Sequence, residues 1–415
     1  MRILQVNKFN YRRGGAEVYF LWLQKVLVDL GHEVAVFSMH HPQNEKSDWE
    51  KYFVSRVSFN EGGVWEKLRA AGRMLYSFEA ATKFDRLLTD FKPDIIHCHN
   101  IYHHISPSIL RVAKKRNIPV VMHLHDYKLI APNYTLYDHG EICYAGIDKN
   151  YWDCVKKNCF YSYSHSFLAY LEMTLHHKIF HFYEQGLALA IAPSQFMHDL
   201  VVKSGWPINK ITTLINPAPN VIPQNVSDND ISSASEPYLL YFGRFVPEKG
   251  VDDLLAVSKT NGFKLHLAGA GPEEAVLKTN YATEISQGQF QFLGHLSKEE
   301  IAKEIKMATV VVMPSRWLEN MPFALLETLA YGQIIIASKI GGFTEIIQDG
   351  INGFLFEAGN KDKLQEKINS VFSFNREDRN NIISKALETV AKLKQSEHLA
   401  VLVNIYLKLV KNKLH

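Results

Sequence analysis

Short apolar runs alternate with helical segments along most of the chain, and this pattern constrains the fold more than any other feature. Most of these runs lack the strict polar alternation of a half-exposed strand, so the strands they form must be buried on both faces. Such strands occur in parallel sheets whose crossover helices cover both faces. The sequence therefore predicts an α/β protein with doubly wound parallel sheets. The predicted strands are residues 3–6, 34–37, 93–97, 118–124, 238–242, 264–268, 290–293, 310–313 and 334–337.

The length of 415 residues favours two domains, because a single hydrophobic core rarely grows that large. Residues 224–236 are polar and flanked by prolines, which predicts an interdomain linker or a long surface loop. The alternation of strands and helices restarts after this stretch. We therefore expect two doubly wound units in tandem with a cleft between them. Ligands of such sheets bind beyond the carboxyl ends of the strands.

Four segments carry helical signals that bear on the fold. A first helix is predicted at residues 16–30, and residues 62–91 are expected to be mostly helical. One long helix is predicted at residues 161–185 and a final helix at residues 380–413. The first helix is expected to face the core through Val18, Leu21, Leu27 and Leu30.

The charge balance and the cysteine content exclude several classes of protein. Lys and Arg number 46 against 43 Asp and Glu, and the resulting formal charge of +3 is too small to indicate a nucleic-acid partner. No apolar run reaches the ~18 residues of a membrane-spanning helix, and the N-terminus lacks a signal-peptide core, which favours a cytoplasmic location. The four cysteines are too few for a disulfide scaffold, and without a C-x2-C pair they are interpreted as structural thiols, not zinc ligands.

A first chemical motif runs from Gly243 to Gly250, where a predicted strand ends and a helix begins. Arg244 offers a planar fork of donors and Lys249 a mobile point charge, and both suit the oxygens of a nucleotide diphosphate. The two glycines allow the backbone to approach a ligand closely. The alternative interpretation is a solvated turn that opens a helix. The presence of a second motif favours ligand binding.

The second motif places Glu319 before a predicted helix at residues 323–330 and Glu327 within it. This helix is otherwise apolar and must be buried, and its N-terminal amides and dipole suit a phosphate. Carboxylates accept paired hydrogen bonds from vicinal hydroxyls, so the two Glu residues are expected to hold a ribose and a hexose. In the alternative interpretation, Glu319 only complements the helix dipole and Glu327 is surface charge.

Three further predicted strand ends carry polar motifs. Gly14 and Gly15 precede Glu17 at the start of the first helix, where a phosphate or an acceptor could approach. His125 ends another strand and is preferred over the histidine two residues earlier as the partner of a sugar hydroxyl near the reacting carbon. Glu345, in a Gly-Gly-Phe-Thr-Glu segment, is expected to line the same cleft.

Together these motifs resemble those of glycosyltransferase family 4, retaining enzymes with the GT-B fold. The resemblance extends nearly end to end, and the combination of G-R-x4-K-G with E-x7-E is its most specific part. It implies two Rossmann-like domains with an interdomain cleft. Residues 1–215 would bind the acceptor, residues 216–379 would bind the nucleotide-sugar, and residues 380–415 would form a helix that crosses back to the N-terminal domain.

The resemblance also implies a reaction and roles for residues. A hexosyl unit would pass from a nucleotide-diphosphate sugar to a glycan or lipid-linked acceptor in polysaccharide or glycoconjugate biosynthesis (EC 2.4). Arg244 and Lys249 would stabilise the leaving diphosphate, Glu319 would contact the sugar, and Glu327 would bind the ribose. His125 would lie near the anomeric centre, and these residues other than Glu327 are the predicted catalytic set. No metal or cofactor is implied, because the cations and the helix dipole supply the electrostatic stabilisation.

The remaining predicted sites extend over both halves of the chain. The predicted donor-binding residues are Gly15, Gly243, Arg244, Lys249, Glu319, Asn320, Met321, Pro322, Phe323, Ala324, Leu325 and Glu327, and the predicted acceptor or cleft residues are Gly14, Gly15, Glu17 and Glu345.

Two other functions stay open beside the glycosyltransferase. A sugar-nucleotide epimerase of the same fold would also bind a nucleotide diphosphate, although no motif supplies its acid and base carboxylates. A catalytically silent protein that binds nucleotide sugars is the second alternative. Peripheral contact with an anionic membrane at the inner face is a hypothesis motivated by the basic and aromatic residues 62–86.

Overall fold

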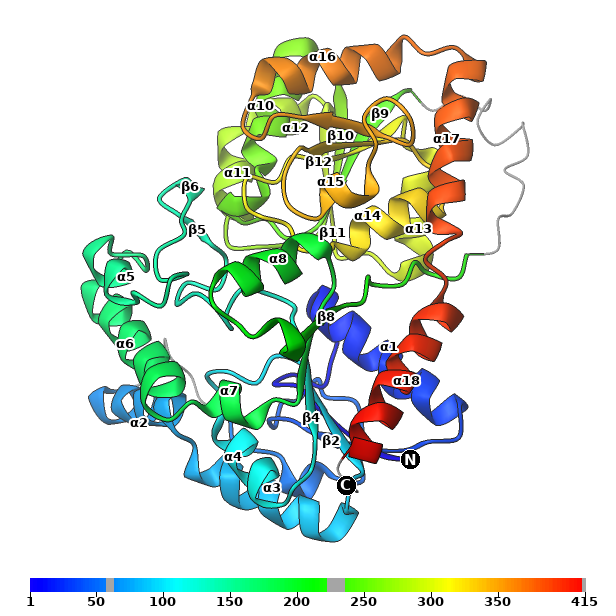
Figure 1. Cartoon of the computed structure of the whole chain (residues 1–415). Coiled ribbons are helices and arrows are strands. Elements are labelled where there is room, and N and C mark those ends of the chain that lie inside the picture. Colours follow the sequence, from blue (N-terminus) through cyan, green and yellow to red (C-terminus); the bar gives the residue numbers. More distant parts are fainter. Residues whose placement is uncertain (57–62, 222–235, 413–415) are drawn as a thin grey trace. The chain divides into compact units, whose positions relative to one another are not determined.

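The computed structural model describes residues 1–56, 63–221 and 236–412, which form two compact units (Figure 1). The N-terminal unit contains Met1–Asp138, Tyr144–Leu214 and Ala400–His415, and the C-terminal unit contains His139–Cys143 and Ile215–Leu399. The predicted linker, apart from Glu236, lies outside the described residues, as does the start of the predicted 62–91 segment.

A parallel sheet of six strands forms the centre of the N-terminal unit. Its strand order is β2-β1-β3-β4-β7-β8. The order reverses between β1 and β3, which places the topological switch point of this sheet there. β7 and β8 were not predicted. The strands are β1 (Arg2–Val6), β2 (Glu33–Phe37), β3 (Ile95–Cys98), β4 (Val120–His123), β7 (Leu189–Ala192) and β8 (Ile211–Thr213).

The C-terminal unit has a second parallel sheet of six strands, in the order β11-β10-β9-β12-β13-β14. Its order reverses between β9 and β12, so its switch point lies there. Buried apolar residues of the strands and of the helices that pack on them, such as Leu239, Leu265, Val310 and Leu364, form one core cluster. The strands are β9 (Tyr238–Phe242), β10 (Lys264–Ala268), β11 (Phe290–Gly294), β12 (Val310–Met313), β13 (Ile335–Ser338) and β14 (Phe354–Phe356), of which only β14 was not predicted.

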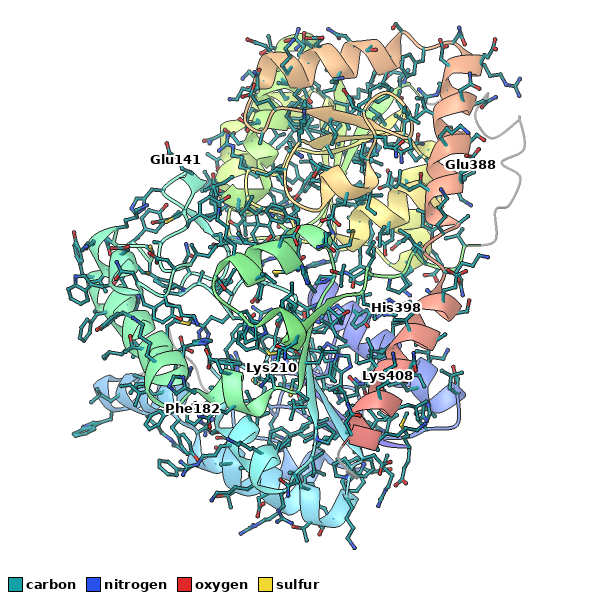
Figure 2. The ribbon with its side chains drawn as sticks, in the orientation of Figure 1. Glu141, Phe182, Lys210, Glu388, His398 and Lys408 are labelled. Carbon is teal, nitrogen blue, oxygen red and sulfur yellow. The ribbon has the colours of Figure 1, made fainter. Side chains whose placement is uncertain are left out.

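Helices follow most strands, and side chains fill the space between the layers of each unit (Figure 2). The helices of the N-terminal unit are α1 (Gly15–Asp29), α2 (Val64–Leu75), α3 (Phe78–Phe91), α4 (Ser108–Lys115), α5 (Trp152–Lys156), α6 (Tyr163–Met173), α7 (Phe182–Gly186) and α8 (Gln195–Lys203). Those of the C-terminal unit are α10 (Val251–Asn261), α11 (Glu274–Asn280), α12 (Ala282–Ser286), α13 (Lys298–Met307), α14 (Phe323–Ala330), α15 (Phe343–Ile346), α16 (Lys361–Phe372) and α17 (Arg376–Val390). The remaining elements are α18 (Gln395–Asn412), the short strands β5 (Tyr137–Asp138) and β6 (Glu141–Ile142), three 3-10 turns (Glu50–Tyr52, Ile208–Lys210 and Pro247–Lys249) and a π-helical turn (Thr174–Ile179). Within the described ranges, no helix is both long and apolar enough to cross a membrane.

The predicted core side of the first helix is largely wrong. Of its four residues only Leu27 is fully buried, and Leu30 is 53% exposed. The helix instead buries Tyr19, Phe20 and Leu23. The buried face of α1 differs from the predicted one because aromatic side chains of the helix pack on a row of histidines in the sheet. The Tyr19 ring lies 4.5 Å from that of His123.

Residues 161–185 do not form one long helix. α6 passes into the π-helical turn Thr174–Ile179, and the chain leaves the helix before α7 begins at Phe182. His181 has a φ of 49°, in the left-handed region, which a continuous right-handed helix excludes.

The predicted final helix is also divided, into α17 and α18. α17 ends at Val390, and α18 begins at Gln395. Between them the carbonyl of Leu393 accepts a hydrogen bond from the amide of Ala218 at 2.9 Å, so it does not accept one from a following helical turn. A tertiary contact that the helical periodicity does not encode therefore interrupts the helix.

Candidate functional site

The C-terminal unit brings its two predicted motifs together at the switch point of its sheet. Gly243 and Arg244 directly follow β9, and Glu319 lies in the loop after β12, the adjacent strand. Lys249 ends the 3-10 turn before α10. The carboxyl ends of parallel strands meet at one edge of a sheet, so residues 70 apart in sequence become neighbours here.

Lys249 and Glu319 form a partly buried ion pair at this edge. The Lys249 Nζ lies 2.6 Å from Oε1 of Glu319, and the Ser315 hydroxyl donates to the same oxygen at 2.5 Å. Glu319 is only 3% exposed, and the Lys249 ammonium also lies 5.2 Å from the centre of the Trp317 ring. The structure thus pairs two residues for which the sequence predicts separate ligand partners, the sugar and the diphosphate.

Glycines allow the loops around this pair to pack backbone against backbone. The Gly342 amide donates to the Glu319 carbonyl at 2.7 Å, and a Cβ at Gly341 would lie 2.1 Å from that oxygen. A Cβ at Gly250 would lie 2.1 Å from the carbonyl oxygen of Pro314, and Gly250 also has a φ of 64°. No other residue fits these contacts, so the glycines determine where Glu319 and Lys249 lie.

α14 directs its N-terminus toward the same edge, as its sequence predicts. It spans Phe323–Ala330, and its N-cap residue Pro322 provides no side-chain hydrogen bond to the first turn. The Asn216 amide donates to the carbonyl of Met321 at 3.1 Å and supports the preceding loop. A helix N-terminus without a side-chain cap favours an anion. Among the predicted donor-binding residues here, Asn320, Met321 and Leu325 are buried, whereas Pro322, Phe323 and Ala324 are partly exposed.

Glu327 lies on the second turn of α14 and is partly exposed. Burial raises the pKa of its carboxyl group to about 7, against the opposing effect of Lys298. The carboxyl group of Glu327 therefore changes charge near neutral pH. Its ionised form is the one suited to accept hydrogen bonds from hydroxyls.

Two other predicted residues of this unit lie at its surface. Arg244 is exposed, and its carbonyl oxygen accepts a hydrogen bond from the Tyr241 hydroxyl at 2.8 Å. Glu345 belongs to the short helix α15 and is partly exposed. The Arg244 side chain is thus accessible to an anionic ligand at the end of β9.

In the N-terminal unit, Gly14 and Gly15 start α1 after the carboxyl end of β1. Gly14 has an extended φ of −163°, and a Cβ there would meet only Oε2 of Glu17, at an ordinary 3.6 Å. The fold therefore does not require glycine at position 14, and the missing side chain mainly leaves the helix N-terminus open to a ligand. Glu17 is buried, and burial raises the pKa of its carboxyl group against the opposing charge of Lys8.

His125 follows the carboxyl end of β4 and is partly exposed, whereas His123 within the strand is fully buried. The Nε2 atom of His125 lies 2.9 Å from Nδ1 of His99. Burial lowers the pKa of His125 to about 3, so its ring is neutral at physiological pH.

Lys8 and Asp126 were not predicted as site residues, yet both lie at this edge of the N-terminal sheet. The Lys8 ammonium lies 4.4 Å from the centre of the Tyr102 ring. Burial lowers the pKa of Lys8, although Asp126 and Glu17 oppose the shift, and burial raises the pKa of Asp126 to about 6. The available signal was a charged residue two positions after a buried strand end, in Val6-Asn7-Lys8.

Comparison with known proteins finds two family models. The model described as glycosyl transferase 4-like domain matches residues 14–217, and that of glycosyl transferases group 1 matches residues 226–389. A protein of Klebsiella pneumoniae, described as an uncharacterized 42.6 kDa protein in the cps region, is 25% identical over 369 residues, which are 83% of this chain and 87% of that protein.

Two solved structures share the fold over almost their entire length. Anabaena Alr3699/HepE, solved in complex with UDP, has a TM-score of 0.67 at 17% identity, with 98% of this chain and 99% of that chain covered. The sucrose-phosphate synthase of Thermosynechococcus elongatus has a TM-score of 0.72 at 14% identity, with 99% of each chain covered. HepE was also solved in complex with UDP-glucose.

Proposed function

The chain belongs to the group 1 glycosyltransferases, with the GT-B fold, and we propose that it transfers a hexosyl unit with retention of anomeric configuration. The donor is a nucleotide-diphosphate sugar, and the acceptor is a glycan or a lipid-linked sugar in polysaccharide or glycoconjugate biosynthesis. The relative encoded in a cps region and the neighbour crystallised with UDP-glucose support this choice of donor and pathway class.

The observation that carries the proposal is the group of charges at the switch point of the C-terminal sheet. Arg244 is exposed at the end of β9, and Lys249 follows in the same segment with its ammonium paired to Glu319. The uncapped N-terminus of α14 adds its positive end to the same edge. The diphosphate leaving group gains about one further negative charge as its bond to the sugar breaks, and fixed cations and helix dipoles stabilise that charge without reorganisation.

In this proposal the sugar end of the donor meets Glu319. The carboxylate has one oxygen bonded to Lys249 and Ser315, so a hydroxyl of the hexose is expected to bond the other oxygen. Glu327 binds the ribose through its ionised carboxylate. Because the cations and α14 supply the charge stabilisation, we propose that no metal is needed, and that excess EDTA leaves the rate unchanged.

A donor panel tests the function. UDP- and GDP-sugars are added to the wild type and to Lys249→Ala, and thermal shift and slow donor hydrolysis are recorded for each. Stabilisation and hydrolysis by one donor, both lost in the variant, would identify the donor and support the site. If a donor raises the melting temperature of the wild type but is neither hydrolysed nor used for transfer, the catalytically silent alternative is supported, and if no donor shifts it, the donor site is contradicted. If NMR shows an epimerised sugar without transfer, the enzyme is an epimerase.

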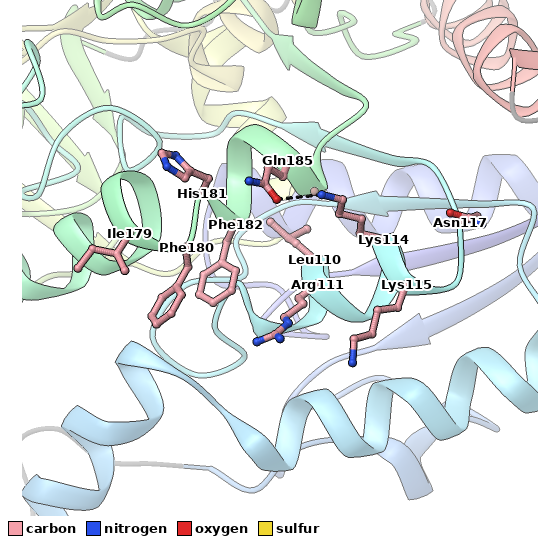
Figure 3. A pocket seen from close by; sticks show the side chains of 11 residues that line it. Leu110, Arg111, Lys114, Lys115, Asn117, Ile179, Phe180, His181, Phe182 and Gln185 are labelled. Atoms are coloured by element: carbon pink, nitrogen blue, oxygen red, sulfur yellow. Dashed lines mark hydrogen bonds between the residues drawn. The ribbon is translucent and has the colours of Figure 1, made fainter.

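We also propose that the N-terminal unit docks on an anionic membrane surface. A cavity of about 660 Å³ lies between Arg111, Lys114 and Lys115 on α4 and the rings of Phe180 and Phe182 (Figure 3). The side chains that line it within the described chain include no carboxylate. Phe182 is buried, whereas Phe180 is 48% exposed, and cations beside an exposed aromatic ring favour the interface of an anionic bilayer.

Aromatic side chains extend this surface toward residues 62–86, the segment for which the sequence suggests membrane contact. The Phe182 ring lies 6.0 Å from that of Tyr76, which lies 4.7 Å from that of Phe78. Phe78 is 77% exposed, and Trp65 on α2 is 84% exposed. Exposed rings of this size are costly in water unless a partner or a membrane covers them.

Flotation with vesicles tests the docking. We expect the wild type to float with phosphatidylglycerol vesicles at low salt and not with phosphatidylcholine vesicles. The double change Arg111→Glu and Lys115→Glu should abolish flotation. Lys25→Glu with Lys408→Glu makes the same change in charge elsewhere on the unit and is expected to leave flotation intact (Lys408, Figure 2). Equal loss in both double variants would contradict a specific surface.

A further inference from the structure

Four histidines lie side by side in the N-terminal unit. His97 belongs to β3 and His123 to β4, while His99 and His125 follow the ends of these strands. The ring centres of His97 and His99 lie 4.4 Å apart, those of His99 and His125 5.2 Å apart, and those of His123 and His125 4.8 Å apart. All three pairs are stacked, so the rings form one layer beneath α1.

Hydrogen bonds connect this layer in a definite order. Nε2 of His99 lies 2.9 Å from Oε1 of Gln5, and Nδ1 of His99 lies 2.9 Å from Nε2 of His125. The Tyr406 hydroxyl lies 2.6 Å from Nδ1 of His97. Gln5 and His97 are register partners on β1 and β3, which places the amide of Gln5 near Tyr406.

The order of these partners determines where the protons lie. His99 is neutral, because burial and the neighbouring imidazoles lower its pKa well below the usual range. A neutral imidazole has one N–H, and the amide oxygen of Gln5 can only accept, so that proton is on Nε2 of His99. Nδ1 of His99 must then accept a proton from Nε2 of His125, whose own Nδ1 carries no proton.

Gln5 lies beside the part of the layer that the C-terminal helix contacts, since it is the register partner of His97. The Tyr406 hydroxyl contacts His97 in the same layer, and it is the amide oxygen of Gln5 that lies 2.9 Å from Nε2 of His99. Tyr406 is fully buried on α18. The contact of the Gln5 oxygen with His99 thereby acts through His99 on the ring at the candidate site.

We propose that His99 is a positioning residue that holds His125 as the Nε2–H tautomer, so that Nδ1 of His125 accepts a hydrogen bond from a hydroxyl of the bound sugar. This rests on the proposed sugar-contacting role of His125. Neighbouring aromatic rings oppose a 180° rotation of either imidazole, which would put ring carbons where the bonded nitrogens lie. The Phe20 ring lies 5.2 Å from that of His99, and the Tyr19 ring 5.8 Å from that of His125.

Nitrogen NMR on wild-type protein labelled with ¹⁵N-histidine tests the tautomer directly. Two-bond correlations between ring nitrogens and carbon-bound protons distinguish a protonated from an unprotonated nitrogen. The His125 signals are assigned by their loss in His125→Asn. We expect a protonated Nε2 and an unprotonated Nδ1 at His125 near pH 7, and the opposite pattern would overturn the proposal.

Two substitutions separate positioning from folding. His99→Asn keeps an oxygen near the place of Nδ1 and should preserve the His125 tautomer, whereas His99→Gln loses that acceptor and should give both tautomers. His99→Gln should lower kcat about 10-fold with a donor KM within about 3-fold of wild type, since a misaligned group mainly costs the transition state. His123→Asn, a similar change in the same layer, should leave the His125 tautomer as it is. A His125 tautomer unchanged in His99→Gln would contradict the proposal.

Activity and tautomer can fail separately. If His125→Ala retains full transfer activity, the proposed role of His125 is wrong, although the NMR pattern still reports whether His99 sets its tautomer. If the tautomer is as expected but kcat in His99→Gln equals that of the wild type, the positioning role is wrong while the glycosyltransferase function stands.

Discussion

At Lys249, a single ammonium group has three neighbours that restrict it before any ligand binds. Glu319 neutralises it, Ser315 shares the same carboxylate oxygen, and the Trp317 ring lies 5.2 Å away. A side chain that loses little freedom on binding pays less entropy for the contact. This arrangement makes Lys249 the residue on which the proposed leaving-group stabilisation most depends.

Lys249→Ala is expected to lower kcat by roughly 10²-fold or more, because a preorganised charge at the leaving group is lost. Lys249→Arg keeps the charge and should recover part of that loss. Turnover of the donor identified in the panel is the measurement. A rate for Lys249→Ala within about 3-fold of wild type would remove Lys249 from the catalytic set. Glu319→Ala should slow transfer while nucleotide affinity is retained.

Glu327 predicts a dependence of nucleotide affinity on pH. Its pKa is raised from 4.5 to about 7 by burial, and a ribose that donates two hydroxyls requires the ionised form. UDP or GDP affinity should therefore be full above about pH 7 and fall by up to about tenfold per pH unit below it. Calorimetry from pH 5.5 to 8 measures this, and Glu327→Gln should bind weakly with no such slope.

The same shift has a sign for stability. The folded pKa lies above the unfolded value, so the unliganded protein binds the proton more tightly when folded. This carboxyl group's contribution to stability is present below about pH 4.5 and is lost as the pH rises through about 7. For the affinity measurement described above, nucleotide affinity that falls as the pH rises through about 7 would show that the ribose does not contact the ionised carboxylate of Glu327.

At the scale of elements, the site consists of loops that pack on one another through glycine. The loop after β12 carries Glu319, and the turn after β13 carries Gly341 and Gly342, whose backbone lies against it. α14 was predicted with its observed bounds, because an apolar eight-residue helix after Pro322 has clear local signals. The contact between the two loops joins residues about twenty apart and has no periodic signal.

Gly341→Ala tests this contact. The new Cβ would lie 2.1 Å from the Glu319 carbonyl oxygen at a φ of 56°. Gly262→Ala is the matched control, because Gly262 has a similar φ of 70° with no atom within 4 Å of its Cβ position. We expect about 1 kcal/mol of destabilisation in the control, and in Gly341→Ala about 2–4 kcal/mol together with loss of the donor-induced thermal shift. Denaturation and the donor panel measure both.

At the scale of the whole chain, α18 from Ala400 to Asn412 belongs to the N-terminal unit although it follows the C-terminal unit in the sequence. Tyr406 carries this connection, since its ring is fully buried and its hydroxyl bonds His97 of β3. α18 thus contributes Tyr406 to the core of the sheet in the N-terminal unit. The resemblance implied a single helix that returns to the N-terminal domain, and the observed α18 begins after a break at residues 391–394.

Tyr406→Ala should destabilise the N-terminal unit by about 3–5 kcal/mol, because a large buried ring and a buried hydrogen bond are both lost. Hydrogen exchange resolves the effect by unit. Protection should fall in β1 and β3, which lie against Tyr406, while β9 and β12 keep their wild-type rates. Equal loss of protection in all four strands would show that the two units unfold together.

Much of the secondary structure of this protein depends on local sequence and could be predicted from it. Buried apolar runs such as residues 238–242 and the turn chemistry of Gly243 and Gly250 depend on neighbours in the chain, so their periodicity and residue types are visible in it. The family, the place of Arg244 directly after a strand and that of Glu327 within a helix followed from these local patterns. β7, β8 and β14 were not predicted, because their short apolar runs were not distinguished from neighbouring helical signals.

Only the tertiary structure decided which side chains meet. The pair of Lys249 with Glu319, the place of Lys8 beside Asp126, and the row of histidines beneath α1 each join residues from different strands. Such contacts depend on strand order and on the direction in which a side chain leaves its strand, and a one-dimensional pattern records neither. The sequence therefore determined which residue types are present at the candidate site. The fold determined the burial, the partners and the charge state of their side chains.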